Sequence, residues 1–407
     1  MIHEIVIIGG GFGGVGVAKS LAKWGRDIHV TLIDKNKYHV FYPSLYEVAT
    51  AHVPESASGH KKVNFHELFS SASCSFDEIF LNDLNVSFLQ GEVLRMDFKE
   101  QKVNLKSGDE IKYDFLVIGA GSESNYFNIL GLYENSIPLK NLNDAFLVRN
   151  SLDELFATSP KNKVFKIIIG GGGFTGCEFA GELVGFLEKL SRIHGRPKFY
   201  FECSIIDGAP NVLSGGASSR AQKKAQDRLS SLGVKLWLGK KIKEVKKKKI
   251  FLENDSVVEY DIFIWAGGVK KNTFSQNQLF VDPYFRVSPY KNVFAVGDSV
   301  YFVNEKTGAP LPMTASMAIR EAKYVAENIK RTIQKQSPLH YNPKFPGFII
   351  PIGGKYAIFE KGKLHMAGFL PWVLKDLISL QYWVSILGFR RGFRHFRRGL
   401  QIFVKND

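Results

Sequence analysis

The chain has 407 residues, of which 45% are hydrophobic and 38 are glycine. That length exceeds one ordinary hydrophobic core, so we expect two or three packed α/β domains rather than a disordered chain. The formal net charge of +15 points to a polyanionic partner, either nucleic acid or an anionic membrane face. The three cysteines, Cys74, Cys177 and Cys203, lack the spacing of a zinc site or of a redox-active disulfide, so we predict neither.

Neither end of the sequence predicts a targeting or membrane-spanning segment. The first predicted strand begins almost at Met1, which leaves no room for a signal peptide. The longest uncharged run near the C-terminus, residues 377–389, is shorter than the roughly 18–20 residues that a spanning helix needs. We therefore expect a protein that works on the cytosolic side.

A glycine turn opens the chain between an apolar strand and a helix. The strand covers residues 5–8, the turn reads Gly9-x-Gly11-x-x-Gly14, and the helix is expected over residues 15–23. A second apolar strand then ends at Asp34, twenty residues past Gly14. This combination is typical of a dinucleotide site, in which the helix N-terminus faces a pyrophosphate and the acid accepts from a ribose hydroxyl.

The next segments lead to a second glycine turn. Residues 35–49 predict an aromatic-rich loop that leads into a short helix, suited to covering a flat ring, whereas residues 61–82 look irregular and remain unassigned. Residues 86–105 predict a hairpin, and residues 113–118 predict a buried strand. That strand ends at Gly119-Ala120-Gly121-Ser122, where backbone can approach a ligand.

The opening pattern then repeats. After a helix near residues 143–156 come a strand at 164–169, the turn Gly171-x-Gly173-x-x-Gly176, a helix at 177–190 and a strand that ends at Asp207. The gap of 31 residues from Gly176 to Asp207 is longer than the usual ~20, and residues 191–198 can hold the excess. The chain thus predicts two dinucleotide sites, whose acids favour NAD over NADP because they repel a 2′-phosphate.

Further segments complete the predicted fold. We expect a helix at 220–232, strands within 234–252, buried strands at 261–268 and 292–298, and a helix from about 314 to 334. Asp298 at a strand end suits the ribityl or pyrophosphate part of a flavin, and the helix beginning near Ala315 directs its positive end at the flavin C2 carbonyl. One FAD and one NADH, with no redox cysteine pair, imply that the electron acceptor docks directly on the flavin.

The tail predicts an amphipathic basic helix. Its apolar positions recur at steps of three and four: Ile386, Phe389, Phe393, Phe396, Leu400 and Phe403. Arginines at 390, 391, 394, 397 and 398 fill much of the rest, which is typical of a helix lying on an anionic membrane, although a docked or dimer-forming helix stays open. The lysine run at 240–249 alternates with apolar residues, so we interpret it as an exposed hairpin face and expect no nucleic acid.

Several motifs together resemble the type II NADH dehydrogenases, single-subunit NADH:quinone oxidoreductases with a glutathione-reductase-like pair of Rossmann domains. They are the first turn, residues 41–49 and 119–127, the second turn through residue 183, residues 264–269, Val296-Gly297-Asp298 and residues 310–315. The resemblance implies an FAD-binding domain over 1–130 and 258–335, an NADH-binding domain over 131–257, and a membrane-associating region over 336–407. It also implies a peripheral enzyme on the cytoplasmic side of the membrane that passes electrons to quinone without proton pumping; a homodimer stays open.

The resemblance also implies the site residues. FAD would be held by Gly9, Gly11, Phe12, Gly13, Gly14, Asp34, Lys35, the Val93 backbone, Gly121, Gly297, Asp298 and Ala315. NADH would be held by Gly171, Gly173, Phe174, Thr175, Gly176, Asp207 and Gly267. Glu178 would help to deliver protons, and Lys375 would lie at the quinone pocket.

One stretch departs from the family pattern. Where the family reads Ala-Gln-x-Ala-x-Gln at its quinone site, this sequence has Ser316 and Arg320 in place of the two glutamines. Ser316 still donates a hydrogen bond but reaches less far, and Arg320 adds a charge. We keep both as candidate catalytic residues, and the identity of the acceptor stays open.

Three alternatives share these motifs. A sulfide:quinone oxidoreductase needs cysteines beside the flavin, and only Cys74 is free of a strand or nucleotide helix in the predicted fold. A soluble NADH reductase for a protein carrier fits poorly with the aromatic tail. A membrane-docked flavin and NADH sensor without turnover stays open because of Ser316 and Arg320.

Overall fold

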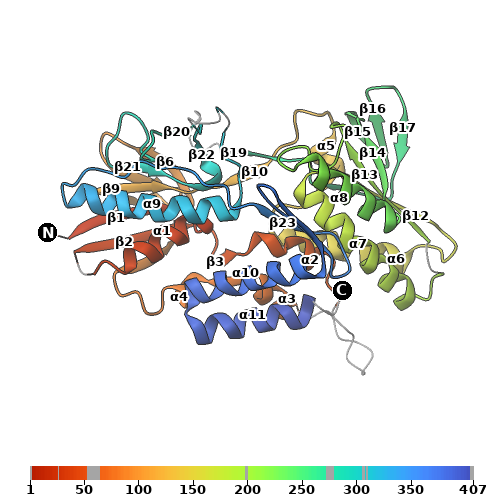
Figure 1. Cartoon of the computed structure of the whole chain (residues 1–407), viewed down its shortest axis with the longest axis horizontal. Coiled ribbons are helices and arrows are strands. Elements are labelled where there is room, and N and C mark those ends of the chain that lie inside the picture. The colour runs from red at the N-terminus through yellow and green to blue at the C-terminus, as the bar shows by residue number, and fades with distance from the viewer. Residues whose placement is uncertain are drawn as a thin grey trace.

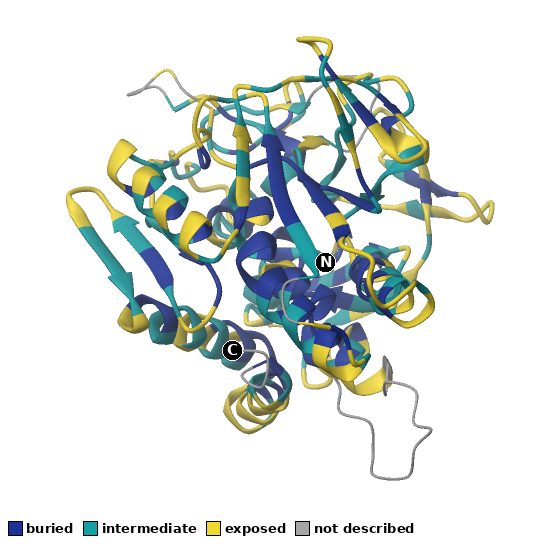
Figure 2. Cartoon of the chain, turned by 90° about the vertical axis from the view of Figure 1, so that its right-hand side faces the viewer, coloured by how far each residue is buried: buried dark blue, intermediate teal, exposed yellow. Residues whose placement is uncertain are grey.

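The computed structural model describes residues 2–25, 27–52, 65–197, 200–271, 279–304, 308 and 310–403. Its first sheet has five parallel strands in the order β21-β9-β1-β2-β5. They are β1 (His3–Ile8), β2 (Ile28–Asp34), β5 (Val86–Gln90), β9 (Phe115–Ile118) and β21 (Val293–Ala295). The helices α1 (Phe12–Ala22) and α9 (Ala315–Ile333) pack side by side against it (Figure 1). The central strands β1 and β9 are largely buried because a parallel sheet is covered on both faces, whereas the edge strand β5 is partly exposed. Figure 2 shows that buried residues gather on strands and helices in the interior of the molecule.

The second sheet repeats this design with the order β11-β18-β12-β13-β14. Its parallel strands are β11 (Ile137–Pro138), β12 (Phe165–Gly170), β13 (Phe201–Asp207), β14 (Lys235–Leu238) and β18 (Ile262–Trp265). The helices α6 (Leu142–Thr158), α7 (Phe174–Ile193) and α8 (Ser219–Ser231) accompany it (Figure 1). The predicted α/β class with two tandem Rossmann-like sheets is confirmed.

One predicted domain boundary does not follow the sheets. The sequence analysis placed residues from 258 onward with the first sheet, but β18 pairs with β12 in the second sheet. The chain returns to the first sheet only after β19 (Val269–Lys271), which pairs antiparallel with β10 (Ser122–Ser124). These two short strands are where the chain passes between the two sheets, so the sheets place this boundary after Lys271, 13 residues beyond residue 258.

Two small antiparallel sheets accompany the parallel ones. The first contains β6 (Val93–Asp97), β7 (Lys102–Leu105) and β8 (Glu110–Lys112), and the second contains β15 (Ile242–Lys246), β16 (Lys249–Leu252) and β17 (Val257–Glu259). The hairpin predicted over residues 86–105 is therefore shorter than expected. Its first part, β5, extends the parallel sheet, with Val86 opposite Val30 on β2. A local pattern does not reveal this pairing between distant segments.

The segment between the first turn and β5 is more regular than the sequence indicated. It contains β3 (Tyr38–Val40), the 3-10 turn η1 (Tyr42–Ser44), α2 (Leu45–Ala49), α3 (Phe65–Ala72), β4 (Ser73–Ser75) and α4 (Phe76–Ile79). Of the stretch left unassigned at 61–82, residues 61–64 lie outside the described residues. The short strands β3 and β4 pair with each other, His39 opposite Cys74.

The C-terminal region forms a sheet and two helices, and the second helix covers most of the amphipathic stretch predicted over residues 386–403. The strands are β23 (Phe348–Pro351), β24 (Ala357–Lys361) and β25 (Leu364–Gly368), and the helices are α10 (Phe369–Leu387) and α11 (Phe389–Phe403). Figure 1 shows α10 and α11 side by side along the lower edge of the molecule. Within the described ranges, no helix is long and apolar enough to cross a membrane. The remaining elements are α5 (Leu132–Asn135), β20 (Leu279–Phe280), η2 (Gly297–Ser299) and β22 (Val300–Tyr301).

The helix α11 lies close to its neighbours because of two glycines. A Cβ added at Gly392 would lie 2.6 Å from the Cα of Val384 on α10, and one added at Gly399 would lie 3.4 Å from the Ser71 carbonyl oxygen on α3. A glycine inside a helix destabilises the helix by about 1 kcal/mol relative to alanine. In α11 that cost is offset by backbone-to-backbone packing.

Candidate active site

The first glycine turn has the geometry of a dinucleotide-binding loop. Gly9 has φ +97°, and a Cβ there would lie 2.3 Å from the Gly119 carbonyl oxygen. A Cβ on Gly14 would lie 1.9 Å from the Gly9 carbonyl oxygen, so the helix could not pack against the strand. Gly11 differs, because a Cβ there would meet no atom within 4 Å. This open side at the N-terminus of α1 fits a pyrophosphate.

Asp34 lies beside this turn. Its carboxylate accepts the Gly10 N–H at 2.7 Å and the Asn36 N–H at 2.8 Å. Burial raises the pKa of Asp34, and the two N–H donors oppose that rise. The next residue, Lys35, is exposed, and its carbonyl accepts from the Gln90 side chain. The acid therefore holds the turn in shape as well as standing where a ribose would lie.

The other residues predicted around the first turn serve packing. The Phe12 ring is buried against His39 and Tyr382, with ring centroids 5.2 and 4.9 Å apart, so only its backbone faces the open side of the turn. A Cβ on Gly13 would lie 2.6 Å from the Val296 side chain. Val93 begins β6 and is buried.

The second turn repeats this geometry. Gly171 has φ +107°, and a Cβ there would lie 2.5 Å from the Cα of Gly267. A Cβ on Gly176 would lie 1.9 Å from the Gly171 carbonyl oxygen, while Gly173 is open. Asp207 accepts N–H groups from Gly172 and, at 2.7 Å, from Ala209. The register that begins at Gly171 is therefore the one that matches the first turn.

The start of α7 supplies two further predicted residues. Thr175 is exposed, and Phe174 packs edge-on against Phe348 of β23 with ring centroids 5.0 Å apart. The C-terminal sheet thus covers one side of the second turn.

Asp298 belongs to a polar network that the sequence analysis missed. Ser122 Oγ donates to the Asp298 carboxylate at 2.5 Å, and Lys140 Nζ donates to Ser122 Oγ at 2.8 Å. The neighbouring Gly297 N–H donates to Glu321 at 2.7 Å, and burial raises the pKa of Glu321 to about 7. Ser122 belongs to the predicted turn Gly119-Ala120-Gly121-Ser122. Nothing in the sequence around Lys140 or Glu321 indicates that these two residues belong to the network.

The start of α9 is built as expected. Thr314 is the N-cap, and its hydroxyl accepts from the Met317 N–H at 3.3 Å. Ala315 is half-buried, and Gly121 donates its N–H to Ser299 Oγ at 2.8 Å near Asp298. Ser316 and Arg320 are both exposed on α9.

A pocket opens between α2, α3, α10 and α11, and we name it the α10–α11 pocket. It encloses about 440 Å³, part of it open to solvent. Its described lining is Phe41, Ser44, Glu47, Ser71, Trp372, Lys375, Asp376, Ser379, Trp383, Phe396, Gly399, Leu400 and Phe403. Five of these thirteen residues are aromatic and six are polar or charged. Aromatic walls with polar groups that can orient a ligand suit a small-molecule site. The lining includes Lys375 but neither Ser316 nor Arg320.

Lys375 is the centre of a charge cluster at this pocket. Its Nζ donates to Glu47 at 2.8 Å and lies 3.3 Å from both the Asp376 carboxylate and the Tyr46 hydroxyl. Desolvation by burial opposes the charged form, yet the carboxylates prevail and raise the pKa of Lys375 well above its ordinary value. Lys375 is therefore a buried cation.

Glu178 is the fifth residue of α7 and interacts electrostatically with Lys375 and Glu47 of this cluster. Burial raises the pKa of Glu178 to about 8; the charge of Lys375 opposes the rise and that of Glu47 adds to it. Its carboxyl is thus largely protonated at neutral pH. Glu178 and Lys375 interact electrostatically, although Glu178 is not among the pocket's lining residues. Ser316 and Arg320, the other two candidate catalytic residues, are on another helix, α9.

The three cysteines are all buried and free. Burial raises the pKa of each thiol, that of Cys203 to about 12. Cys74 Sγ lies 3.4 Å from the Glu78 carboxylate on α4. A thiol in that setting is not a nucleophile, so the geometry does not favour sulfide chemistry at Cys74.

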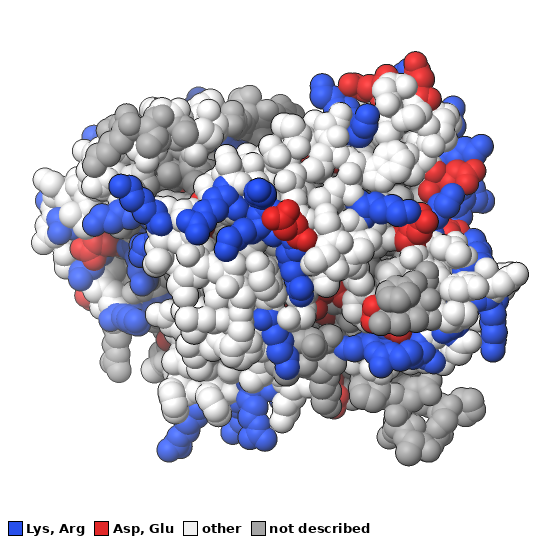
Figure 3. All heavy atoms as spheres, turned by 45° about the vertical axis from the view of Figure 1, so that its right-hand side comes forward, with Lys and Arg blue, Asp and Glu red and all other residues white. Residues whose placement is uncertain are grey.

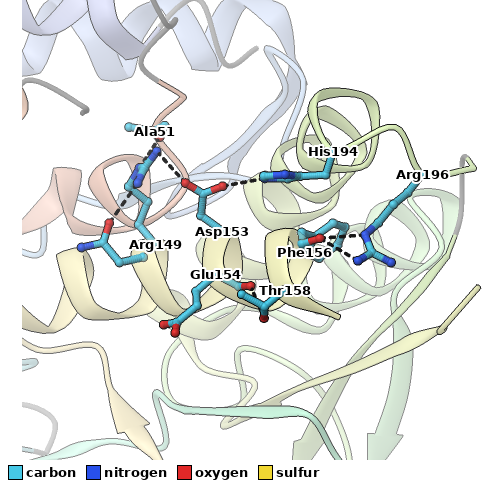
Figure 4. A network of polar contacts seen from close by, with 9 residues as sticks. Ala51, Arg149, Asp153, Glu154, Phe156, Thr158, His194 and Arg196 are labelled. Carbon is cyan, nitrogen blue, oxygen red and sulfur yellow. Dashed lines mark hydrogen bonds and ion pairs between the residues drawn. The ribbon is translucent and has the colours of Figure 1, made fainter. Parts of the chain in front are cut away.

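A buried arginine fixes the end of α2, the helix that carries Glu47. Arg149 on α6 donates from Nε to the Ala51 carbonyl at 3.0 Å and lies 3.6 Å from Asp153, which also contacts His194 of α7 at 2.8 Å (Figure 4). Arg196 donates to the Phe156 carbonyl at the C-terminal end of α6. The position of α2 is thus set by the second sheet's helices.

A family model for pyridine nucleotide-disulphide oxidoreductases matches residues 3–322, and the chain belongs to this family. Within the family it is similar to a type II NADH:quinone oxidoreductase, NdhA of Mycobacterium tuberculosis, with 28% identity over 94% of this chain and 84% of that one. These findings confirm the resemblance that the motifs indicated.

Solved structures support the fold. NDH2 of Plasmodium falciparum, solved in complex with NADH, has a TM-score of 0.82 at 19% identity, covering 97% of this chain and 98% of that one. The sulfide:quinone oxidoreductase of Aquifex aeolicus has a TM-score of 0.76 at 22% identity, covering 99% and 96%. Both structures share this fold, so the fold does not show whether NADH or sulfide is the electron donor. The residues of the site have to decide between the two.

Proposed function

We propose that this protein is a type II NADH:quinone oxidoreductase, which moves two electrons from NADH through FAD to a membrane quinone without pumping protons. The observation that carries this proposal is the pair of matching glycine turns together with the α10–α11 pocket, whose lining includes the largely buried Lys375. The similarity to NdhA supports it.

We assign FAD to the first turn. The open side of Gly11 and the N-terminus of α1 would receive the pyrophosphate, Asp34 and Lys35 would stand at the ribose, and Val93, Gly121, Gly297 and Asp298 would follow the rest of the molecule. Bound FAD would supply hydride acceptance and two-electron transfer. The N-terminus of α9 at Ala315 would stabilise negative charge on the reduced ring.

We assign NADH to the second turn. The open side of Gly173 and the N-terminus of α7 would receive its pyrophosphate, and Asp207 would accept from the ribose 2′-hydroxyl. The Asp207 carboxylate repels a 2′-phosphate, so NADH would be favoured over NADPH. The loop at Gly267 lies against Gly171 and would close the site from the other side.

We assign the quinone to the α10–α11 pocket. Trp372, Trp383 and Phe396 would contact the ring, and Lys375 would hydrogen-bond a quinone oxygen as negative charge develops there. Glu178 would donate one of the two protons that convert the reduced quinone into quinol. Ser316 and Arg320 lie outside the pocket lining, so their departure from the family pattern leaves this assignment intact.

We further propose that α10 and α11 place the protein on the cytoplasmic face of an anionic membrane. Phe369, Leu370, Leu377, Ile378, Phe389 and Phe393 are exposed on these helices, Phe389 by 73%. Arg390, Arg394, Arg397 and Arg398 are exposed beside them, and Figure 3 shows basic side chains and largely uncharged surface on the lower part of the face in view. Aromatic and arginine side chains together suit a lipid interface. The alternative is that a second copy of this chain covers the same face of α10 and α11 and forms a homodimer.

Spectra and turnover of the purified protein test the function. We expect a yellow protein that releases FAD on denaturation and oxidises NADH continuously when a short-chain quinone is added. A protein without flavin, or one that oxidises a single equivalent of NADH and then stops, would contradict the proposal; the second result would support the sensor alternative.

A further inference from the structure

The α10–α11 pocket contains a carboxylate to which no role has been assigned so far. Glu47 lies on α2, faces the pocket and accepts a hydrogen bond from Lys375 at 2.8 Å. Both side chains are largely buried, with exposed fractions of 15% for Glu47 and 18% for Lys375. A buried ion pair is sensitive to the loss of either member, because the remaining charge is left without a partner.

The pair joins parts of the chain that are far apart. Glu47 comes from the segment after the first turn, and Lys375 comes from the C-terminal helix α10. On its other side, α2 is held by Arg149, which donates to the Ala51 carbonyl just beyond the helix. Glu47 is thus fixed from the second sheet, and it fixes Lys375 in turn.

The charged and titratable groups around the pair come from three helices. α2 contributes Tyr46 and Glu47, α7 contributes Glu178 and Glu182, and α10 contributes Lys375 and Asp376. The segments of α3 and α11 that line the pocket contribute Ser71, Phe396, Gly399, Leu400 and Phe403, none of which is charged. Lys375 is the cation of this cluster.

We propose that Glu47 is a positioning residue that holds the Lys375 ammonium at the pocket wall, where it would meet a quinone oxygen. This inference rests on the proposed function. The overall reaction converts NADH, one solvent proton and quinone into NAD+ and quinol, so the two electrons come from NADH and one proton enters from the solvent. Glu178 passes a proton to the reduced quinone oxygen and is reprotonated from solvent.

Removal of Glu47 has an electrostatic consequence with a definite sign. The negative charge of Glu47 raises the pKa of Glu178, and the positive charge of Lys375 lowers it. In Glu47→Gln the charge of Glu47 is lost and that of Lys375 remains, so the pKa of Glu178 falls. A nearby charge shifts a pKa by about one unit or more. Glu178 is then ionised at a pH where it was protonated before.

The test is the pH dependence of quinone-driven NADH oxidation. In the unchanged protein the rate should fall as pH rises through about 8, the pKa of Glu178. In Glu47→Gln the midpoint should move down by about one pH unit, while anaerobic flavin reduction by NADH stays unchanged. Quinone binding, followed by quenching of Trp372 and Trp383 fluorescence, should weaken several-fold.

Three variants serve as comparisons. Asp376→Asn also removes a negative charge beside Lys375. The Asp376 charge is not among the main influences on the pKa of Glu178, so the midpoint of the pH profile should shift less than in Glu47→Gln. Glu134→Gln changes an exposed carboxylate on α5 and should leave the profile in place. Glu47→Asp should restore part of the midpoint, and it replaces Glu47→Gln if the latter does not fold.

The outcomes separate the two claims. An unmoved midpoint in Glu47→Gln, or a shift equal to that of Asp376→Asn, overturns the positioning role while the oxidoreductase function stands. If the unchanged protein shows no quinone-dependent turnover, the proposed function and this inference fail together.

Discussion

Asp34 and Asp207 occupy equivalent places, each accepting the N–H of the residue after the first glycine of its turn. The sequence predicted both acids as ribose ligands from their position at strand ends. It did not predict that they also brace the turns, because that role depends on where the backbone folds back. Each acid therefore has a structural role in its turn, and we propose a binding role in addition.

Asp207→Arg should weaken NADH use and gain NADPH use. Loss of a hydrogen bond to a charged group costs about 1.5–3 kcal/mol, so kcat/KM for NADH should fall by about ten- to hundredfold. Steady-state kinetics with both nucleotides measure this change.

Asp34→Arg is the matched control. It should lower FAD content instead and leave the preference between NADH and NADPH unchanged in the molecules that retain FAD. An unaltered preference in Asp207→Arg would show that Asp207 is not the ribose ligand.

His39 connects the first turn to α10. Its Nδ1 donates to the Gly10 carbonyl at 2.8 Å, so its Nε2 accepts from the Tyr382 hydroxyl, also at 2.8 Å. Burial lowers the pKa of His39 to about 4, which keeps the ring neutral. The C-terminal helix is thereby hydrogen-bonded to the loop that we assign to FAD.

Tyr382→Phe should destabilise the protein and loosen FAD. It leaves the buried Nε2 of His39 without a donor, at a cost of about 1–3 kcal/mol. Thermal unfolding should occur at a lower temperature, and apoprotein should bind FAD more weakly. Tyr133→Phe, which changes an exposed ring, should do neither. If the two variants had the same unfolding temperature and the same affinity for FAD, His39 would not connect α10 to the first turn.

At the scale of elements, the glycine turns were predictable and the α10–α11 pocket was not. A turn such as Gly9 to Gly14 can be recognised from the spacing of its glycines between a strand and a helix, although Gly9 approaches the distant Gly119. The pocket is assembled from α2, α3, α10 and α11, whose pairing depends on packing between distant segments. Lys375 could be named only through a family resemblance, and Glu47 not at all.

The tail shows the same limit. The periodicity from Ile386 to Phe403 correctly predicted an amphipathic helical region, but Gly388 divides it into two helices. Part of the predicted apolar stripe, Phe396 and Phe403, lines the pocket, while Phe389 and Phe393 stay exposed. A hydrophobic stripe alone does not reveal which of its residues meet protein and which meet solvent or lipid.

Replacing the four exposed arginines of α11 by glutamine should release the protein from anionic vesicles. Arg390, Arg394, Arg397 and Arg398 are the positions to change, whereas Arg391 stays because it donates to the Glu78 carbonyl. Each basic residue near an anionic surface contributes about 1 kcal/mol, so affinity should fall by at least about a hundredfold. Vesicle co-sedimentation measures it.

The lysine hairpin provides a control of equal charge. Changing Lys243, Lys246, Lys247 and Lys249 to glutamine removes four charges from β15, β16 and the turn between them, away from α11. Binding to anionic vesicles should change little. If the two quadruple variants bind alike, net charge rather than α11 attracts the membrane.

At the scale of the whole molecule, the two turns that we assign to nucleotides and the pocket that we assign to quinone lie on connected parts of the fold. The first sheet carries one glycine turn, the second sheet carries the other, and α10 packs against Phe12 of the first turn while reaching Glu47 on α2. The helices that would meet the membrane therefore also form the pocket. Electrons would enter from the side of the second sheet and leave toward α10 and α11.

The most direct test of this account is an anaerobic titration of the purified protein followed by visible absorption. We predict that one equivalent of NADH bleaches the flavin absorption and that one equivalent of a short-chain quinone then restores it, in the absence of oxygen. Flavin that stays oxidised with excess NADH, or that remains bleached after quinone is added, would contradict the account.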